Sequence, residues 1–568
     1  MSTTDWIVLV ITLAGIVIYG LYRGRGQRDM DSYYLGNRSM PWFLILLSIM
    51  GTQASAITFL SGPGQAYTDG MRFVQYYFGL PLAMVVLCVT FVPAFHKLKV
   101  YTAYEFLEKR FDVKTRALTS FLFLLQRGLS TGISIYAPSI ILSSLLGWNI
   151  YWTNIFMGGA LIIYTVAGGA KSVAYTQKQQ FFIIFVGMFL AGYLVVALMP
   201  SGVSFNDALH VSGKLGKLNV IVTDFDWHDK YNIWSGVIGG FFLALSYFGT
   251  DQSQVGRYLT GSSVAESRTG LLMNGFVKVP MQFLILLIGA LLFVFYQFYE
   301  SPVLFNKAQV QQVYATSYGD ELRQVQQQYD KLTNVKQQQV HEMVQAMHKD
   351  NESEVNHWQD KLQQSQQKSK DIRQKAKAVI KKADPLADTN DTNYIFLYYV
   401  LNKLPHGLIG LLIAIIFLAA WGSISSALNA LASTSIVDIY KRMFRQDAPD
   451  RHYLMVSRWC TLGWGLFSIG VAEFANKMGS LIETVNILGS IFYGTILGVF
   501  ITAFYLKKLK ATPVFLAALI TEGIVIYVYL LDIISFLWLN VVGCLGVVII
   551  ASLLQAGVLA RETSIAKG

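Results

Sequence analysis

Long apolar runs, separated by short polar or basic stretches, follow one another along almost the whole chain. Each run is about 20 residues long, the length at which an α-helix crosses the hydrocarbon core of a bilayer. The pattern therefore predicts an all-α polytopic membrane protein. We expect about thirteen transmembrane helices, near residues 6–22, 40–62, 74–95, 117–146, 150–168, 178–199, 233–254, 270–298, 394–436, 455–474, 480–505, 511–531 and 534–556.

The composition agrees with this prediction and orients the chain. Of 568 residues, 54% are hydrophobic and only 14% are charged, and the net charge is +11. Basic residues gather in alternate short loops: Arg23, Arg25, Arg28, Arg38, Lys97, Lys99, Lys109, Arg110, Lys114, Arg116, Lys441, Arg442, Arg445, Arg451, Arg458, Lys507, Lys508 and Lys510. By the positive-inside rule these loops face the cytoplasm, so the N-terminus is outside and the C-terminus inside. The charge therefore belongs to the membrane surface and indicates no nucleic-acid partner.

Several functional classes find no support in the sequence. The three cysteines, Cys88, Cys460 and Cys544, are far apart, and no metal-ligand motif or nucleophile–base pair emerges. No GxxxxGK[ST] phosphate loop is present either. We therefore expect neither an enzyme nor an ATP-driven pump. The first span has no basic segment before it and no cleavage site after it, so we expect a retained helix in a plasma membrane, most simply a bacterial inner membrane.

Residues 302–392 interrupt the membrane pattern with a Gln- and Lys-rich stretch. Apolar residues recur there at helical spacing, as in Leu322, Val325 and Tyr329, which is typical of a helical hairpin or short coiled coil. We therefore divide the chain into helices 1–8 (1–301), an extracytoplasmic helical insert (302–392) and helices 9–13 (393–568). The insert is either a solvated spacer or an arm for a protein partner or self-association. The sequence leaves both interpretations open.

Two of the predicted spans carry the features of an ion site. Ala419, Ser423 and Ser426 in the ninth span are three and four residues apart, which places them on one helix face. In the second span, Gly51 and the run Gly62–Pro63–Gly64 favour a break that frees backbone carbonyls. Hydroxyl and carbonyl oxygens are the ligands that hard cations prefer, and secondary transporters build ion sites at broken helices. This pair of spans indicates an ion-coupled transporter.

Several blocks of this sequence resemble the sodium/solute symporter family, which includes the sodium–glucose, iodide, proline, pantothenate and sialic acid carriers. The likeness covers about residues 5–300 and 390–555. The blocks are Tyr101-TAYEFLEKR-Phe111, Ile133-SIYAPSII-Leu142, Tyr164-TVAGGAKSVAYTQKQ-Gln180, Gly249-TDQSQVGRY-Leu259 and Ile487-LGSIFYGTILGV-Phe500.

This resemblance implies a LeuT-like core of two inverted five-helix repeats, with one helix before them and two after. Spans two to six would form the first repeat, and spans seven to eleven the second. The resemblance also implies a sodium site between spans two and nine. Its ligands would be the carbonyls of Gly51, Ala54 and Ala419 and the hydroxyl of Ser423, with Ser426 lining the same face.

Two positions depart from the family's pattern. Gly422 stands where the family often has a second hydroxyl, and Gln177 stands where it has an acidic residue. In some relatives that acid helps to hold an additional sodium, so we expect no second sodium of that type. The adjacent Lys178 suggests that an ammonium replaces a cation, which would make transport sodium-independent or proton-coupled. The competing interpretation is that Lys178 reaches to the cytoplasmic interface.

Candidate solute contacts follow from a buried charge and from the resemblance. Arg127 lies well inside a predicted span, where a charge is costly and marks a functional site by default. It is a candidate donor to a substrate carboxylate, and bonds to a neighbouring helix or to Gln126 are the alternatives. By their positions in relatives, four further residues would line the central site: Gln53, Thr58, Phe78 and Tyr136.

We therefore expect a secondary active transporter that couples sodium to a small organic solute by alternating access. The solute would be a carboxylate or sugar-like, and the sequence does not name it. The alternative is the sodium-independent or proton-coupled carrier. A transporter-like solute sensor is less favoured, because few residues follow the last span. The expected partners are sodium, the solute and the lipid bilayer.

Overall fold

The computed structural model describes residues 1–23, 30–385, 387, 389–475 and 479–565. Every named element within these ranges is a helix, and a single β-bridge joins Met40 to Gly261. The predicted all-α class is therefore confirmed. Arg25 and Arg28, counted above among the basic loop residues, lie outside the described residues.

The helices before the insert include most of the predicted membrane spans. They are α1 (Thr3–Arg23), α2 (Met30–Leu35), α3 (Trp42–Gln53), α4 (Ala56–Asp69), η2 (Met71–Tyr77), α5 (Leu80–Val86), α6 (Val92–Leu98), α7 (Tyr104–Arg110), α8 (Val113–Leu146), α9 (Ile150–Ala197), α10 (Phe205–Lys214), η4 (Ser235–Gly239), α11 (Gly240–Thr250), α12 (Gln252–Tyr258) and α13 (Val264–Phe298).

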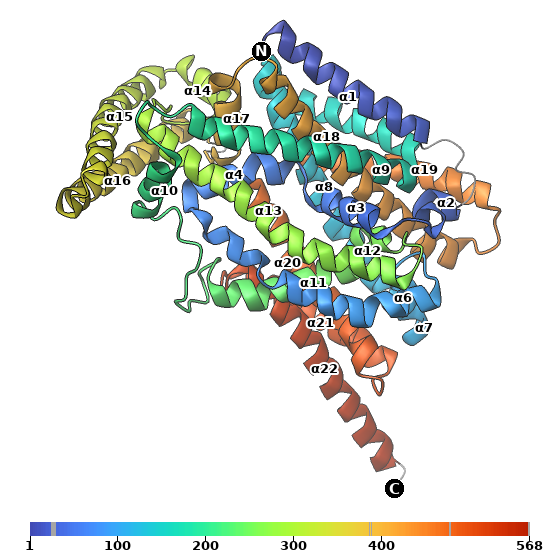
Figure 1. Cartoon of the computed structure of the whole chain (residues 1–568). Coiled ribbons are helices and arrows are strands. Elements are labelled where there is room, and N and C mark those ends of the chain that lie inside the picture. Colours follow the sequence, from blue (N-terminus) through green and yellow to red (C-terminus); the bar gives the residue numbers. More distant parts are fainter. Residues whose placement is uncertain (24–29, 386, 388, 476–478, 566–568) are drawn as a thin grey trace.

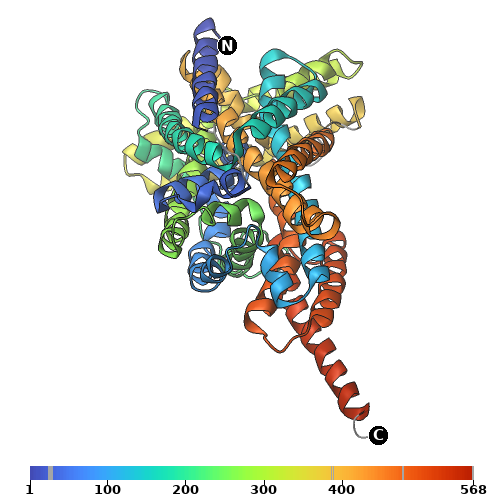
Figure 2. The same ribbon diagram turned by 90° about the vertical axis from the view of Figure 1, so that its right-hand side faces the viewer.

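The insert and the remaining spans follow. Their helices are α14 (Lys307–Tyr314), α15 (Gly319–His348), α16 (Glu352–Ala383), α17 (Thr392–Lys403), α18 (Leu408–Thr434), η5 (Ser435–Phe444), α19 (Asp450–Ala472), α20 (Leu481–Tyr505), α21 (Ala511–Leu530) and α22 (Phe536–Ile565). The end of α22 projects beyond the other helices in both views of the molecule (Figures 1 and 2).

Ten segments of the described chain are long and apolar enough to cross a bilayer, and the bent pair α3–α4 supplies one more. Two shorter apolar segments, Ile150–Val166 and Ser235–Thr250, lie where the sequence predicts two further spans. Although these two segments are short, each can lie within the membrane. The first continues in the rest of α9, and the second is followed by α12.

The predicted spans at 150–168 and 178–199 are joined in one helix, α9. Its 48 residues correspond to about 72 Å of straight helix, more than twice the hydrocarbon thickness of a bilayer. Both ends lie on the side of the insert. Asn149 lines a cavity with Asn306, and the carbonyl of Leu198 accepts a hydrogen bond from Tyr299 at 2.8 Å. The helix direction therefore reverses within α9, whose side chains at 167–172 and 174 are not described.

The second span is broken as expected, three residues after Gly51 and not at the run Gly62–Pro63–Gly64. α3 and α4 meet at 61° across Ala54 and Ser55, where Ala54 leaves helical geometry with ψ of 77°. The run Gly62–Pro63–Gly64 instead lies inside α4. Its glycines allow close packing, since a Cβ on Gly64 would lie 2.0 Å from the carbonyl oxygen of Thr392 on α17. The expected break at this run is therefore wrong.

The seventh span is also broken, at Asp251 between α11 and α12. Asp251 is extended, and its carboxylate accepts a hydrogen bond from the backbone N–H of Ser253 at 2.8 Å. This bond satisfies one of the free N–H groups at the start of α12. The two breaks fall in the first helix of each five-helix repeat of the LeuT-like core.

The ninth span begins later than predicted. The expected range 394–436 is divided between α17 and α18, with Pro405 and Gly407 in the connection. Proline has no N–H to continue the helix, and Gly407 adopts a left-handed φ of 88°, so both residues stop α17. The span itself runs from Leu408 through η5 to Phe444.

In the insert, α15 and α16 form a long antiparallel pair joined by residues 349–351. The pair lies at one end of the helix bundle, with its tip beside α10 (Figure 1). Leu322, Val325 and Tyr329 of α15 are buried together with Val379 and Ile380 of α16. The apolar stripes of the two helices thus cover each other.

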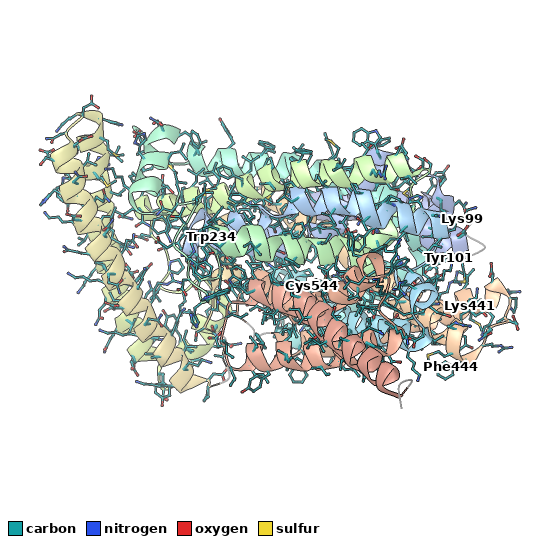
Figure 3. The ribbon with its side chains drawn as sticks, turned by 90° about the horizontal axis from the view of Figure 1, so that it is seen from below. Lys99, Tyr101, Trp234, Lys441, Phe444 and Cys544 are labelled. Carbon is teal, nitrogen blue, oxygen red and sulfur yellow. The ribbon has the colours of Figure 1, made fainter. Side chains whose placement is uncertain are left out.

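The basic loops meet at the opposite end of the bundle from this pair. Lys99 and Lys441 lie there, far from α15 and α16 (Figure 3). Arg38 donates to the carbonyl of Lys99 at 3.0 Å, and Arg110 donates to the carbonyl of Lys507 at 2.8 Å. Loops that are distant in sequence therefore form one basic surface.

Candidate ion and solute sites

The hydroxyl face of α18 lies against the break between α3 and α4. Ser423 lines the same cavity as Gln53 and Ser55. Its hydroxyl donates to the carbonyls of Ala419 and Ala420, at 3.0 and 3.1 Å. Because the proton is directed along its own helix, the hydroxyl keeps an oxygen lone pair for a ligand.

The facing helix end supplies backbone oxygens. α3 ends at Gln53, so its last carbonyls, including that of Gly51, have no following helical turn to bond. Ala54 is buried at the break, and its N–H bonds the carbonyl of Met50 at 2.7 Å. Neutral oxygens on two facing helices suit a dehydrated monovalent cation, which needs oxygen ligands but little negative charge.

Gln177 of α9 fills the adjacent space between α3 and α18. Its amide nitrogen donates to the hydroxyls of Thr52 and Ser426, both at 3.3 Å, and to the carbonyl of Gly422 at 3.2 Å. Ser426 was assigned above to the sodium-lining face. In the structure its hydroxyl bonds Gln177, Thr52 and Gly422, so it belongs to the Gln177 cluster.

Lys178 points away from this cluster. Its side chain is exposed, and the ammonium lies 5.8 Å from the ring centre of Phe43. Adjacent residues of a helix point about 100° apart, so Gln177 and Lys178 cannot both face α18. This position does not favour the hypothesis that Lys178 replaces a cation in the site, and it agrees with the competing interpretation that Lys178 reaches to the interface.

A cavity of about 100 Å³ lies between the two helix breaks. Three predicted solute contacts, Gln53, Thr58 and Arg127, line this central cavity. Phe78 is not among its lining residues, and Tyr136 lines a separate cavity beside α14. Tyr136 lies more than two turns beyond Arg127 on α8, toward the insert, which explains why the two side chains do not share a site.

Arg127 is held by Asp251 at the second break. The two side chains form an ion pair, and Tyr493 joins it: its hydroxyl donates to Asp251 at 2.6 Å and accepts from Arg127 at 3.2 Å. The Asp251 side chain is fully buried. Gln126 bonds within its own helix instead. Of the alternatives considered above, the bond to a neighbouring helix is therefore present, although Arg127 also faces the cavity.

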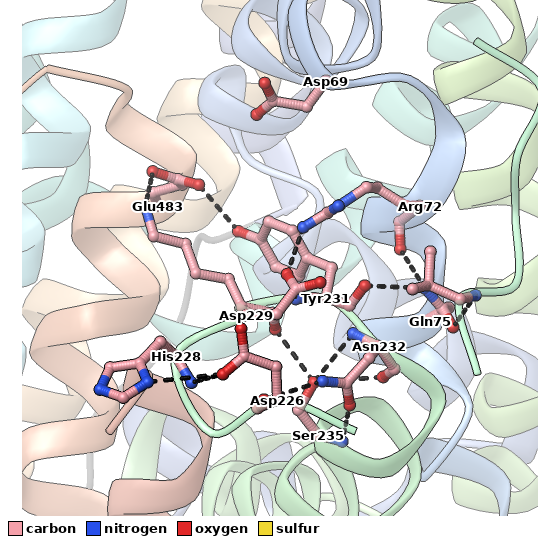
Figure 4. Close-up of polar contacts among 12 residues, drawn as sticks. Asp69, Arg72, Gln75, Asp226, His228, Asp229, Tyr231, Asn232, Ser235 and Glu483 are labelled. Carbon is pink, nitrogen blue, oxygen red and sulfur yellow. Dashed lines mark hydrogen bonds and ion pairs between the residues drawn. The ribbon is translucent and has the colours of Figure 1, made fainter. Parts of the chain in front are cut away.

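A second polar network lies on the other side of the central cavity (Figure 4). Glu483 of α20 accepts hydrogen bonds from Lys230 and Tyr231, both at 3.1 Å. Arg72 forms an ion pair with Asp229 in the same loop. Neighbours of Glu483 on α20 line the cavity, so the Glu483 network lies directly beside it.

The sequence interpretation missed several of these contacts. Thr52 donates to Ser426 at 3.0 Å and so links α3 to α18. Its position between two proposed site residues, Gly51 and Gln53, was a signal in the sequence that could have identified it. Ser48, one turn earlier, donates to the amide oxygen of Gln177 at 2.8 Å. Tyr493 lies in a block that was noted only for its resemblance, and no spacing connects it to Asp251.

Two interrupted membrane helices that meet beside a small polar cavity define the architecture of a secondary transporter. A model of the sodium:solute symporter family matches residues 33–316 and 376–521. The chain belongs to this family.

Individual relatives agree with this assignment. The chain is 25% identical to the sodium-dependent multivitamin transporter of Oryctolagus cuniculus, over 88% of this chain and 66% of that protein. It is 23% identical to the sodium/sialic acid symporter NanT of Aliivibrio fischeri, over 97% and 93% of the two chains. The chain thus spans just under two thirds of the length of the Oryctolagus cuniculus multivitamin transporter.

A solved structure shows the same fold. The structure of a sodium-coupled sialic acid symporter in a substrate-bound outward-open state covers 98% of this chain, and 98% of its own chain is covered. The TM-score is 0.75 and the sequence identity is 22%.

The Arg127–Asp251 pair is expected to be energetically coupled. Arg127→Met or Asp251→Asn alone leaves a buried partner without its counter-charge and should cost about 3–5 kcal/mol of unfolding free energy. The double variant should cost less than the sum of the two. Unfolding of the purified protein in detergent measures all three. The exposed pair Arg323–Asp320 is the control and should contribute below about 1 kcal/mol. Additive costs would contradict the coupling.

Proposed function

We propose that this chain is a sodium-coupled secondary transporter that carries a small organic carboxylate by alternating access. The central cavity carries the proposal, because Arg127 lines it together with neutral amides and hydroxyls from both broken helices. Relatives named for sialic acid and monocarboxylates support an anionic solute. A sugar-like solute is the second candidate, since Arg127 is the one charged residue among the described cavity residues.

Sodium would bind where α3 and α18 face each other. Its ligands would be the carbonyls of Gly51, Ala54 and Ala419 and the hydroxyl of Ser423. The geometry supports this assignment, because Ser423 directs its proton back along α18 and leaves oxygen toward the break. The names of sodium-coupled relatives support the choice of ion.

We further propose a single sodium per cycle. The amide nitrogen of Gln177 donates to the three oxygens that surround it, so these oxygens already have a hydrogen-bonding partner. A neutral amide adds no negative charge to attract a second cation. The cluster then serves as a fixed link between α9, α3 and α18.

Alternating access would follow from the two networks on opposite sides of the cavity. The Arg127–Asp251–Tyr493 contacts would close the inner side, and the Glu483 network the outer side. Sodium that bridges α3 and α18 would favour the outward-open state by its higher affinity for that state. Solute binding would follow.

We place the basic surface in the cytoplasm and the insert on the opposite side of the membrane. The positive-inside rule and the meeting of the basic loops at one end support this orientation. The N-terminus would then lie outside and the C-terminus inside. A bacterial inner membrane remains our proposal for the location.

Sodium should stabilise the folded protein through Ser423. In a thermal-unfolding titration of the purified protein, sodium should raise the midpoint saturably, and potassium or choline should not. Ser423→Ala should weaken the apparent sodium affinity at least about tenfold, or about 1.4 kcal/mol. Ser433→Ala is the matched control, because Ser433 bonds back along the same helix far from the break. Equal sodium affinity in both variants would exclude this ligand assignment.

Gln177→Asp should create a second cation site. The carboxylate would add a negative charge beside the oxygens of Thr52, Gly422 and Ser426. In the present protein these oxygens accept hydrogen bonds from the Gln177 amide. The unfolding midpoint should then rise more steeply with the logarithm of the sodium concentration. The slope should approach the value for two bound ions instead of one. Gln180→Asp, on the same helix, is the control. An unchanged slope in Gln177→Asp would argue against the proposed role of the amide.

Transport should require a carboxylate on the solute. Proteoliposomes with an inward sodium gradient should accumulate sialic acid or lactate, and lactamide or glucose should neither accumulate nor compete. The physical reason is that a neutral amide cannot form a charge-assisted pair with Arg127. Sodium-driven uptake of glucose without uptake of either acid would favour the sugar-like alternative.

A further inference from the structure

The pair α15–α16 lies outside the part of the chain that the family accounts for. The family match skips residues 317–375, which include α15 and most of α16. The pair does not project freely, because it lies along the end of the helix bundle (Figure 1). It contacts the transport helices at its base, its middle and its tip.

The base of the pair is fastened beside the outer end of α4. Arg373 of α16 donates to both carboxylate oxygens of Asp391 at 2.8 Å, and Asp391 also accepts the backbone N–H of Phe305 at 2.8 Å. The ring of Phe305 lies 5.7 Å from that of Tyr67 on α4, edge to face. The buried ion pair therefore positions an aromatic contact with the broken helix.

The tip of the pair is fastened to α10. His348 lies 3.1 Å from the carboxylate of Asp207, which belongs to the first turn of α10. Gln359 donates to the carbonyl of Lys214, the last residue of α10, at 3.0 Å. Between tip and base, Gln366 donates to Gln297 of α13. Both ends of α10 thus contact the pair.

Lys217, three residues after α10, caps the outer end of α4. Its ammonium donates to the carbonyl of Thr68, and its carbonyl accepts the N–H of Met71 at 2.9 Å. A cation suits the free carbonyls at a helix C-terminus. Burial lowers the pKa of Lys217 to about 8, and the nearby Asp69 opposes this shift. The pair therefore reaches the end of α4 through α10.

We propose that α15–α16 is a built-in clamp on the outer half of the broken helix. By holding Tyr67 at the base and Lys217 through α10 at the tip, it restrains rotation of α4 about Ala54 and Ser55. This inference rests on the alternating access proposed above: the clamp favours the arrangement in which the Glu483 network closes the outer side of the cavity. Its strength sets how often that side opens.

The test measures outer opening in the full-length protein without any solute. Asn486→Cys places a thiol in the cavity wall on α20, and its rate of modification by a membrane-impermeant maleimide is followed by peptide mass spectrometry. Adding His348→Ala and Gln359→Ala should raise this rate at least threefold. The control adds Lys382→Ala and Glu321→Ala, which remove an exposed ion pair within the clamp, and should leave the rate unchanged.

A second variant and a second readout keep the test decisive. Adding Gln366→Ala to the tip variant removes the bond to Gln297 between tip and base, and it should raise the modification rate at residue 486 further. Amide hydrogen exchange at 66–71 should be faster in the tip variant than in the control, because the last turn of α4 loses its restraint. Unchanged modification and exchange in a stably folded tip variant would overturn the proposal.

Discussion

In a bilayer, every backbone group freed by a helix break needs a partner, and this constraint organises the whole site. The chain satisfies the two breaks differently. The break at Ala54 and Ser55 shares the central cavity with Ser423 of α18, whereas at Asp251 the carboxylate caps α12 and binds Arg127. The proposed ion site therefore lies at one break, and the other break is closed by a charge pair within the protein.

The Gln177 cluster shows how one buried side chain sets the chemistry of the space between α3, α9 and α18. An acid at this position would leave a buried negative charge that needs a cation. The amide supplies its own N–H groups instead and bonds Thr52, Gly422 and Ser426. Three helices are thereby linked by neutral hydrogen bonds, which need no ion to be stable and do not change with salt.

The lengths of the apolar runs were enough to predict the membrane helices, because the thickness of a bilayer fixes how many apolar residues each helix needs. Local sequence failed where packing decided the outcome. Pro63 is tolerated inside α4, since neighbouring glycines admit close helix contact, and the break falls at Ala54 instead. The Arg127–Asp251 pair joins residues 124 positions apart, and no local pattern records such a contact. The Ser423 face was visible because helical spacing alone brings those residues together.

The side-chain hydrogen bonds of the two halves of the broken helix reach different neighbours, although both halves pack against α13 and α18. α3 is bonded to α9 and α18 through Ser48, Thr52 and the Gln177 amide. α4 is bonded at its outer end to α20, where Ser480 donates to Gln65 at 2.9 Å, and to the loop after α10. Ala54 and Ser55 are the residues between these two sets of bonds. In the proposed cycle, opening of the outer side with the Gln177 cluster intact would turn α4 about this point and leave α3 in place.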